Sequence, residues 1–409
     1  MSGVNQNIGK TWSWRETCPF SQVIEIKDQV FLSGQPPLDD EGNVVAPNDI
    51  AGQTRCVFEN MKRVLESKGL SLKNLVRLNT YYVFDGEDDD ATKYWEDMTR
   101  VRLEYFPDPG PAATAVRIKG MPYEGQLIQI EGIALKNADF AKRVRVMPEG
   151  SWDWSISVPL SQGWVCDDRI YVGGQISADK KGVAVHVNDV VSQTNAIYDY
   201  IDTVVRDGGG DPGDLAHLKI CFKYDSSGRH ENVYLQKIIE VTKNRYGSKC
   251  PVITCFGVDL LYPGLVLEID AMAFKTSHSR ISTTPRLGKD FGDCFAAAIT
   301  AGHETWIGGQ EAIGPNGSVM FHGDAVAQAK IVFENLKVLL GKAGLNIEDI
   351  VRLNMFFVGE GDISQEFHDV MRVWQEFAPQ SNPTMTSVKA YELSSPGVEF
   401  MAECIAMKC

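Results

Sequence analysis

The sequence lacks long hydrophobic runs, a secretory leader and an excess of positive charge. None of its apolar stretches approaches the ~20 residues that a membrane-spanning helix requires. The N-terminal segment MSGVNQNIGKTWSW has neither the charged nor the apolar part of a secretory signal. The 409 residues include 40 Lys and Arg against 54 Asp and Glu, a formal charge of -14. Because such a chain has no basic field to neutralise phosphates, we expect neither a nucleic acid nor a membrane surface as partner.

Patterns that bind metals or nucleotides are also missing. The chain has no Cys-x-x-Cys, and its seven histidines all follow residue 185 without a His or Cys partner at ligand spacing. The glycine-rich segment at residues 208–214 lacks the strand–GxxxxGK–helix context of a phosphate loop. We therefore expect no metal and no cofactor. The nine cysteines, several within apolar runs such as LKICF, are typical of small buried side chains in a reducing cytoplasm, which predicts a cytoplasmic protein.

The sequence does contain an internal repeat. A strand-like segment ending in Gly-Gln occurs at residues 30–35, 170–175 and 305–310. Eighteen residues after each of these glutamines stands another one, namely Gln53, Gln193 and Gln328. Residues 53–83 and 328–358 then align without a gap at 14 identities over 31 positions. Such self-similarity at a fixed period predicts three copies of one structural unit.

Polar joints divide the chain into units at about 1–140, 141–280 and 281–409. Each unit reads as two alternating strands, an amphipathic helix, a strand, a second helix and two further strands, the order ββαβαββ. The first helix of unit one carries the apolar stripe Val57, Phe58, Met61, Val64 and Leu65. Gly69 indicates its end. This order predicts an α+β fold with both helices on one face of each sheet.

The other face of each sheet must be buried against another layer, and the two other units of the same chain can provide it. We therefore expect the three sheets to pack inward around a shared axis as a pseudo-trimer within one chain. The expected architecture has a central β-barrel-like core, helices outside and ligand clefts between neighbouring units. The chain would be a monomer in this sense, and the sequence leaves further self-association open.

The repeated motifs resemble the Rid family of reactive intermediate deaminases, also called YjgF/UK114. They are SGQ at residues 33–35, Gln53-Thr54, Glu59-Asn60, Pro111-Ala112 and the terminal strand LIQIEGIAL. The resemblance extends over the whole chain, three times. It implies a chorismate mutase-like fold and an assembly of three units with a cleft at each interface. It also implies hydrolysis of enamines or imines to keto acids and ammonia.

The residues that perform this chemistry in the family are mostly replaced. The position of the arginine that clamps the substrate carboxylate, two residues after the family proline, holds Ala113, Ile253 and Met385. The position of the glutamate that orients water holds Gln129, Glu268 and Met401. The N-terminal aromatic position holds Phe20, Leu160 and Phe295, without a hydroxyl. The chain is therefore not expected to be a standard 2-aminoacrylate deaminase.

Charged candidates for catalysis remain. Four residues beyond each missing arginine, on the same face of the strand, stand Arg117, Gly257 and Lys389. The last acidic position of the family holds Glu131, Asp270 and Glu403. We expect Arg117 and Lys389 to approach these carboxylates in units one and three, or the acids to be structural. In unit two, Glu268 and Asp270 share one strand face, where each raises the pKa of the other and favours a general acid or base.

Other repeated positions are predicted to bind substrate beside the clefts. The glycines of the Gly-Gln motifs, which allow close approach of a ligand or of the next unit, are Gly34, Gly174 and Gly309. The threonines that follow the clamp position, which bind substrate or a neighbouring strand, are Thr114, Thr254 and Thr386. Phe20 and Phe295 are expected in the same clefts. Two Trp-x-Trp pairs, at 12–14 and 152–154, either line a cleft mouth or cover a sheet edge.

These features predict a hydrolase or deaminase that acts on a C–N bond (imine, enamine or amide) of a small nitrogen-containing metabolite. Glu268 would deliver the water, and Arg117 or Lys389 would hold negative charge in the transition state. One alternative is a metabolite-binding or regulatory protein without activity, which the missing clamp arginines favour. A further alternative is a cyclic amide ring-opening hydrolase that uses Ser/Lys pairs, for which unit three offers Ser387 and Lys389.

Overall fold

The computed structural model describes residues 19–86, 88–136, 143–225, 232–281, 294–361 and 363–408. Trp12 and Trp14 lie outside these ranges. Within the ranges, no helix is both long and apolar enough to cross a membrane. The cysteines described there are free thiols, and most of them are buried.

The chain forms the order ββαβαββ three times, which confirms the repeated units, and the second and third units carry one more strand in front of it. The first comprises β1 (Val23–Ile26), β2 (Gln29–Gln35), α1 (Ile50–Glu66), β3 (Leu75–Tyr82), α2 (Asp88–Tyr105), β4 (Ala112–Arg117) and β5 (Ile128–Leu135). The second comprises β6 (Arg143–Val146), β7 (Gly163–Cys166), β8 (Arg169–Gln175), α3 (Val190–Asp207), β9 (Leu215–Lys223), α4 (Val233–Tyr246), β10 (Val252–Val258) and β11 (Leu267–Phe274). The third comprises β12 (Ser279–Ile281), β13 (Ala298–Ala301), β14 (Glu304–Glu311), α5 (Ala325–Lys342), β15 (Ile350–Phe357), α6 (Ile363–Phe377), β16 (Thr384–Lys389) and β17 (Phe400–Met407).

The first helix of unit one shows the predicted amphipathic pattern. Its apolar stripe, including Val57, Met61 and Leu65, is buried against the sheet. The helix ends at Glu66, and Gly69 follows in the turn with a φ of 70°, a conformation that favours glycine. The helix thus ends three residues before Gly69.

The repeated glutamine that follows each Gly-Gln motif has a structural role. In unit one, Gln53 lies in the first turn of α1. Its Nε2 donates to the carbonyl of Gly125 at 2.8 Å, and its Oε1 accepts from the amide of Leu127 at 2.8 Å. Gln193 and Gln328 make the corresponding contacts in the other units. This side chain therefore fastens the helix start to the turn that precedes the last strand.

The three sheets share one topology. The order in unit one is β1-β2-β5-β3-β4, and the other sheets repeat it with an additional outer strand, β6 or β12. Only the last pair is parallel, β4 with β3, β10 with β9 and β16 with β15. Strand β12 begins at Ser279 and pairs with β13 of the third sheet. Its first residues thus precede the boundary at 280 that the sequence predicts.

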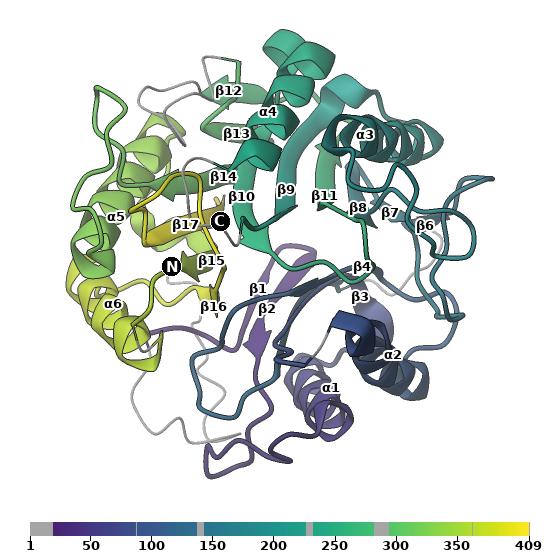
Figure 1. The fold of residues 1–409 in the computed structure, drawn as a ribbon. Coiled ribbons are helices and arrows are strands. Elements are labelled where there is room, and N and C mark those ends of the chain that lie inside the picture. Colours follow the sequence, from purple (N-terminus) through teal and green to yellow (C-terminus); the bar gives the residue numbers. More distant parts are fainter. Residues whose placement is uncertain are drawn as a thin grey trace.

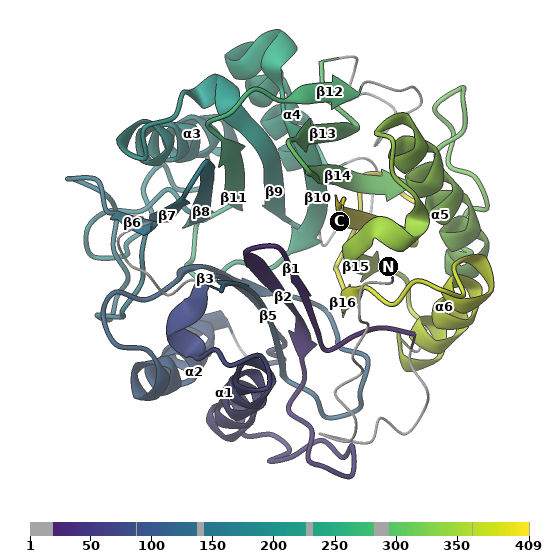
Figure 2. The same cartoon turned by 180° about the vertical axis from the view of Figure 1, so that it is seen from behind.

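The sheets surround a common centre, and the α-helices lie on the outside (Figure 1). The view from behind shows the same arrangement (Figure 2). An edge strand of each unit lies beside a strand of the next, β4 beside β8, β10 beside β14 and β16 beside β2. We call these contacts the first, second and third seam. Single β-bridges connect the ends of the edge strands, between Arg117 and Asp259, Gly257 and Glu392, and Gly120 and Lys389.

The expected β-barrel-like core is not closed. The three sheets stay separate, because neighbouring edge strands share only isolated bridges. Side chains fill the centre instead. A hydrophobic cluster drawn from all three sheets includes Phe31, Tyr171 and Trp306. Polar side chains also lie on the inner faces of the sheets, and they set the chemistry of the centre.

Candidate functional site

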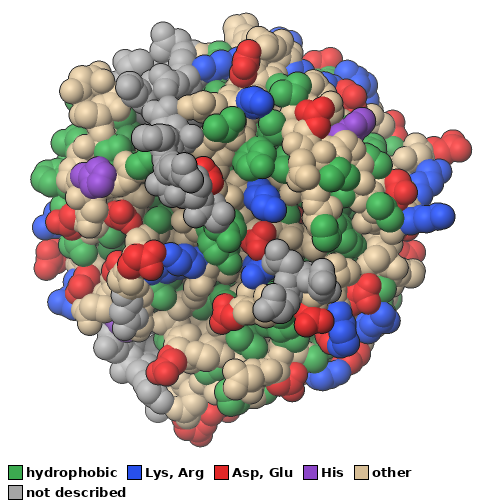
Figure 3. Space-filling view, in the orientation of Figure 1, with side chains coloured by type: hydrophobic (Ala, Val, Ile, Leu, Met, Phe, Trp, Pro, Cys, Tyr) green, Lys and Arg blue, Asp and Glu red, His purple; other side chains and the backbone are tan. Residues whose placement is uncertain are grey.

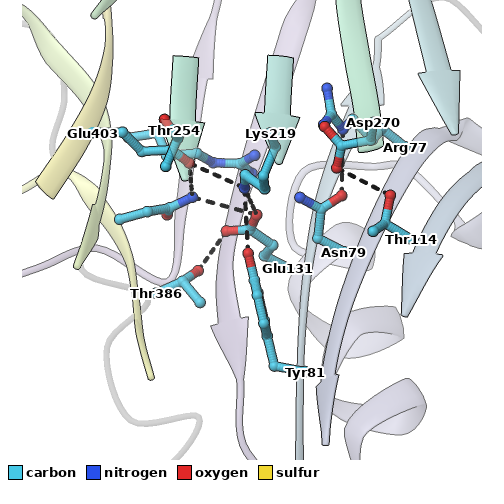
Figure 4. Close-up of polar contacts among 12 residues, drawn as sticks. Arg77, Asn79, Tyr81, Thr114, Glu131, Lys219, Thr254, Asp270, Thr386 and Glu403 are labelled. Atoms are coloured by element: carbon cyan, nitrogen blue, oxygen red, sulfur yellow. Dashed lines mark hydrogen bonds and ion pairs between the residues drawn. The ribbon is translucent and has the colours of Figure 1, made fainter. Parts of the chain in front are cut away.

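A ring of threonine–carboxylate hydrogen bonds joins the units (Figure 4). Thr386 Oγ1 donates to Glu131 at 2.5 Å, Thr114 Oγ1 to Asp270 at 3.0 Å and Thr254 Oγ1 to Glu403 at 2.5 Å. In each case the threonine belongs to the unit that precedes the acid in the cycle. All six side chains are buried. The contacts agree with the structural interpretation of these acids, since each carboxylate is already bound by the neighbouring strand.

Lys219 extends this ring into an ionic cluster. It occupies the position in β9 that Asn79 and Asn354 occupy in the other units. Its Nζ lies 3.0 Å from Glu403, 3.7 Å from Glu131 and 3.2 Å from the hydroxyl of Tyr81. Burial alone would lower the pKa of Lys219, but the surrounding carboxylates hold this pKa well above its usual value. The lysine therefore stays charged between the two glutamates.

Three further basic side chains occupy one repeated position of the inner strands. Arg77 forms an ion pair with Asp270. His217 Nε2 lies 3.1 Å from Glu403. Arg352 donates to the carbonyl of Gly132 at 2.5 Å. Burial would raise the pKa of Glu403, but Lys219 and His217 hold it well below its usual value.

The space among these side chains is too small for a metabolite. The central cavity measures about 20 Å³, which accommodates about one water molecule. Sequence reasoning did not identify Arg77, Lys219 or Arg352, although a basic residue in an otherwise apolar strand was a visible signal. These groups form a structural centre.

Contrary to expectation, Arg117 does not pair with Glu131 and Lys389 does not pair with Glu403. Arg117 Nη1 pairs with Asp259 at 2.8 Å, and Lys389 Nζ donates to the carbonyl of Gly361 at 2.6 Å. The alternation of the strand explains the difference, because Thr114 points to the centre and Arg117, three residues later, points to the opposite face. Ser387 shares the face of Lys389 but is not bonded to it, and its hydroxyl has no partner among the described residues.

The glycines of the Gly-Gln motifs make room for one side chain at each seam. A Cβ on Gly34 would lie 2.5 Å from Gln129, a Cβ on Gly174 would lie 2.0 Å from Glu268, and a Cβ on Gly309 would lie 2.5 Å from Met401. Any side chain on these glycines would collide with the group opposite. The three seams therefore present an amide, a carboxyl and a thioether at one equivalent place.

Glu268 at the first seam is the ionisable member of this set. Its side chain is buried, and its Oε1 has no hydrogen-bond partner among the described residues. Burial raises the pKa of Glu268 to about 8, and the charge of Asp270 adds to the rise, while a hydrogen bond from the backbone of Ala115 opposes it. Most Glu268 carboxyl groups therefore carry a proton at neutral pH.

The other two seams have no ionisable group at the equivalent place: Met401 stands there at the second seam, and at the third seam Gln129 Nε2 donates to the carbonyl of Gly34 at 3.0 Å. At the second seam, Ile253, Phe295 and Met401 belong to one hydrophobic cluster. At the third seam, Phe20 and Met385 pack together in another cluster. Phe20 and Phe295, predicted to bind substrate, thus fill space between units.

The first seam contains a cavity of about 40 Å³. Ala113 and Ala115 of β4 line it, together with the rings of Phe58 and Trp95 from unit one. Trp154 of unit two lines the cavity as well, whereas Trp152 of the same Trp-x-Trp pair is buried and donates its Nε1–H to Gln175 at 3.0 Å. Arg102 of α2 is its charged lining residue. Because Ala115 also bonds to Glu268, the carboxyl and the cavity adjoin the same residue of β4.

Among the described residues, no three His, Cys, Asp or Glu side chains are arranged to hold a metal ion. The fold and the seams define a protein of three related α+β modules in one chain, with a carboxyl and a cavity at one of three unlike interfaces.

The chain belongs to the family described as Endoribonuclease L-PSP, whose model matches residues 14–136, 155–275 and 293–408. This match confirms the family resemblance and the threefold repeat. The chain is similar to a RutC family protein of Pyrococcus horikoshii, with 37% identity over 118 residues that cover 29% of this chain and 87% of that protein. It is also similar to the 3-aminoacrylate deaminase RutC of Acinetobacter baylyi, with 34% identity over 116 residues that cover 28% of this chain and 86% of that protein.

A crystal structure of a chorismatase resembles the whole fold. It superposes with a TM-score of 0.54 at 14% identity, covering 82% of this chain and 93% of that one. At this identity the likeness concerns the fold.

Proposed function

We propose that the chain is a hydrolase that replaces the C–N bond of a small imine or enamine with a C–O bond at the first seam. Relatives in the family support this class of reaction, since one of them is a 3-aminoacrylate deaminase. The observation that carries the proposal is the buried Glu268, with its unpartnered Oε1 and a pKa of about 8, beside a cavity between two modules. Perturbed ionisable groups of this kind are typical of functional sites.

Glu268 acts first as a general acid. A protonated carboxyl donates its proton to the imine nitrogen and makes the adjoining carbon electrophilic. Water then adds to this carbon, and the Glu268 carboxylate accepts a proton from the water. The resulting carbinolamine releases ammonia and leaves a carbonyl group. One water is consumed for each ammonia released, and Glu268 ends in its starting state.

The site lies between two of the three modules, and their arrangement is part of the proposal. We propose that residues 1–140, 141–280 and 281–409 act as a covalent counterpart of a three-subunit assembly, so that one seam specialises while the others become scaffold. The replacement of Glu268 by Met401 at the second seam and by the uncharged Gln129 at the third supports this division of labour. The chain would act as a monomer on a small-molecule substrate in the cytoplasm.

Ammonia release tests the proposal. Imines generated in situ by an amino acid oxidase, together with stable enamines, lactams and amides, are offered to the wild type and to Glu268→Gln. We expect release of ammonia from at least one imine or enamine, and a loss of about 100-fold or more in Glu268→Gln. The matched control is Gln129→Met, which changes the equivalent side chain at the third seam to the residue found at the second. Ammonia release that survives Glu268→Gln would contradict the proposal.

A binding protein without activity is the second candidate. It is favoured by Ala113, Ile253 and Met385, which replace the clamp arginine in every unit. Saturable binding of an imine analogue without turnover, unchanged in Glu268→Gln, would support it. The cyclic amide hydrolase is disfavoured, because Lys389 is bonded to Gly361 rather than to Ser387.

Cleavage of RNA, which the family description suggests, is disfavoured by charge. Acidic residues outnumber basic ones by 54 to 40. Figure 3 shows acidic and basic side chains interspersed on one face, without a broad basic patch. A surface of this kind offers little attraction for a phosphate backbone.

A further inference from the structure

Two of the three seams are fastened by a serine hydroxyl that donates to the carbonyl of the residue before the family proline in the neighbouring unit. At the third seam, Ser21 Oγ donates to the carbonyl of Asn382 at 2.8 Å. At the first seam, Ser161 Oγ donates to the carbonyl of Gly110 at 2.7 Å. Both serines are buried, and each stands fourteen residues before the glutamine of its Gly-Gln motif. The two hydrogen bonds are therefore equivalent.

The second seam lacks this hydroxyl, and two cysteines lie there instead. Ala296 stands at the position of the serine. Cys250 is the residue before the family proline of unit two, and Cys294 lies two residues before Ala296 in unit three. The side chains of Cys250 and Cys294 are in hydrogen-bond contact. Two sulfur atoms from different units thus meet where the other seams have a serine.

The two thiols differ in exposure. Cys250 is buried, and its Sγ lies 3.7 Å from the carbonyl oxygen of Thr242. Burial first and the neighbouring Cys294 second raise the pKa of Cys250 to about 12. Cys294 is partly exposed and packs against the hydrophobic cluster that contains Cys250. A soluble oxidant therefore reaches Cys294 first, and Cys250 stands behind it as a protonated thiol.

A cation lies beside both sulfur atoms. Arg280 of β12 donates from Nη1 to the carbonyl of Lys249, the residue before Cys250, at 3.1 Å. Burial lowers the pKa of Arg280, and its electrostatic interactions with Cys250 and Cys294 oppose this change. A thiolate is the form of cysteine that attacks oxidants, and a nearby positive charge favours it. An accessible thiol, a cation and a second thiol within reach are together typical of a redox-sensitive pair.

We propose that Cys294 and Cys250 form a reversible disulfide that links units two and three when the protein meets a peroxide. The Cys294 thiol loses its proton, and its sulfur attacks one peroxide oxygen and breaks the O–O bond, which gives a sulfenic acid and hydroxide. The Cys250 sulfur then attacks the Cys294 sulfur and displaces hydroxide. The two hydroxides take up the two thiol protons. One hydrogen peroxide is reduced to two waters, and two thiols are oxidised to one disulfide.

The disulfide gives the second seam a covalent link in place of the missing serine contact. The two cysteines are separated by 43 residues of the chain. A crosslink that closes a loop of this length restricts the unfolded chain and so stabilises the folded one. The proposal concerns the second seam, and it depends neither on Glu268 nor on the reaction proposed for the first seam.

Peptide mapping of the full chain tests the proposal. The protein is treated with hydrogen peroxide, its remaining thiols are blocked, and it is digested with trypsin without reductant. We expect a linked pair of peptides, 250–275 and 290–330, which dithiothreitol separates, with fragmentation that assigns the link to Cys250 and Cys294. Cys250→Ser and Cys294→Ser should each abolish the pair. Cys255→Ala is the matched control in the same peptide, with the residue that unit one has there, and it should retain the pair.

Thermal unfolding measures the effect of the link. Peroxide treatment should raise the Tm of the wild type and of Cys255→Ala by about 3 to 10 °C, and it should leave the Tm of Cys250→Ser and Cys294→Ser unchanged. Accumulation of Cys294 as a sulfinic acid, or its linkage to a cysteine other than Cys250, in protein that is folded by circular dichroism would overturn the proposal. An unchanged Tm in wild type that carries the disulfide would show that the link does not stabilise the second seam, which would also overturn it.

Discussion

Replacing Glu268 by glutamine should change how the stability of the protein depends on pH. In the folded chain the pKa of Glu268 is raised from 4.5 to about 8, by burial first and by the charge of Asp270 second. In the unfolded chain the same carboxyl ionises near its usual pKa of ~4.3. The folded state therefore holds the proton more tightly. The stabilising contribution of Glu268 is fully present below about pH 4.5 and is lost as the pH rises through about 8.

The size of the effect follows from the two pKa values. At ~1.4 kcal/mol per pH unit, a pKa difference of about 3.5 corresponds to about 5 kcal/mol. Glutamine has nearly the same shape and no proton to lose. We expect Glu268→Gln to match the wild type in free energy of unfolding near pH 4.5 and to exceed it by several kcal/mol near pH 9.

Urea denaturation of both proteins at a series of pH values measures this difference. All other titrating groups are common to the two chains and cancel when the curves are subtracted. A difference that stays constant between about pH 5 and pH 9 would refute the conclusion that Glu268 is protonated in the folded protein at neutral pH.

Two other changes probe the centre and the first seam. Lys219→Met should lower the free energy of unfolding by about 3 to 5 kcal/mol, because it leaves Glu131 and Glu403 buried without their cation; a loss below about 1 kcal/mol in urea titrations would show that the cation is dispensable. Gly174→Ala should reduce ammonia release by about 10-fold or more, because its Cβ would lie 2.0 Å from Glu268 Oε1. Gly341→Ala, with nothing within 4 Å of the added carbon, is its control, and equal rates in the two variants would argue against a role for Glu268. If Glu268 acts as an acid, the rate should fall as the pH rises through about 8, and a flat profile to about pH 9 would exclude that role.

The sequence predicted the repeated units and their elements well, because both depend on local patterns. The spacing of Gln53, Gln193 and Gln328 defined the register of the three copies, and the structure gives each of these side chains the same contacts. The apolar stripe of α1 predicted which face is buried. Glu268 was also visible, since an acid in an apolar strand needs a compensating environment.

The partners of the charged side chains were beyond prediction from one sequence. Strand alternation indicated that Arg117 and Ala113 share a face, but the residue opposite Arg117 is Asp259 from another unit. Lys219 joins Glu131 and Glu403 of two other units, which no local pattern relates. Arg102 stands in α2 between the buried Val101 and the exposed Leu103, and nothing in its spacing shows that it reaches a cavity.

The sequence by itself determined that three related modules follow one another, which elements each contains and which catalytic residues of the family are replaced. The tertiary structure alone decided which seam holds a carboxyl and a cavity, and which acids are bound by threonines. The physical reason is the separation along the chain of the groups that interact. Periodicity and capping act over a few residues along the chain, whereas a buried charge is stabilised by groups that only the packing of distant units brings within about 3 Å.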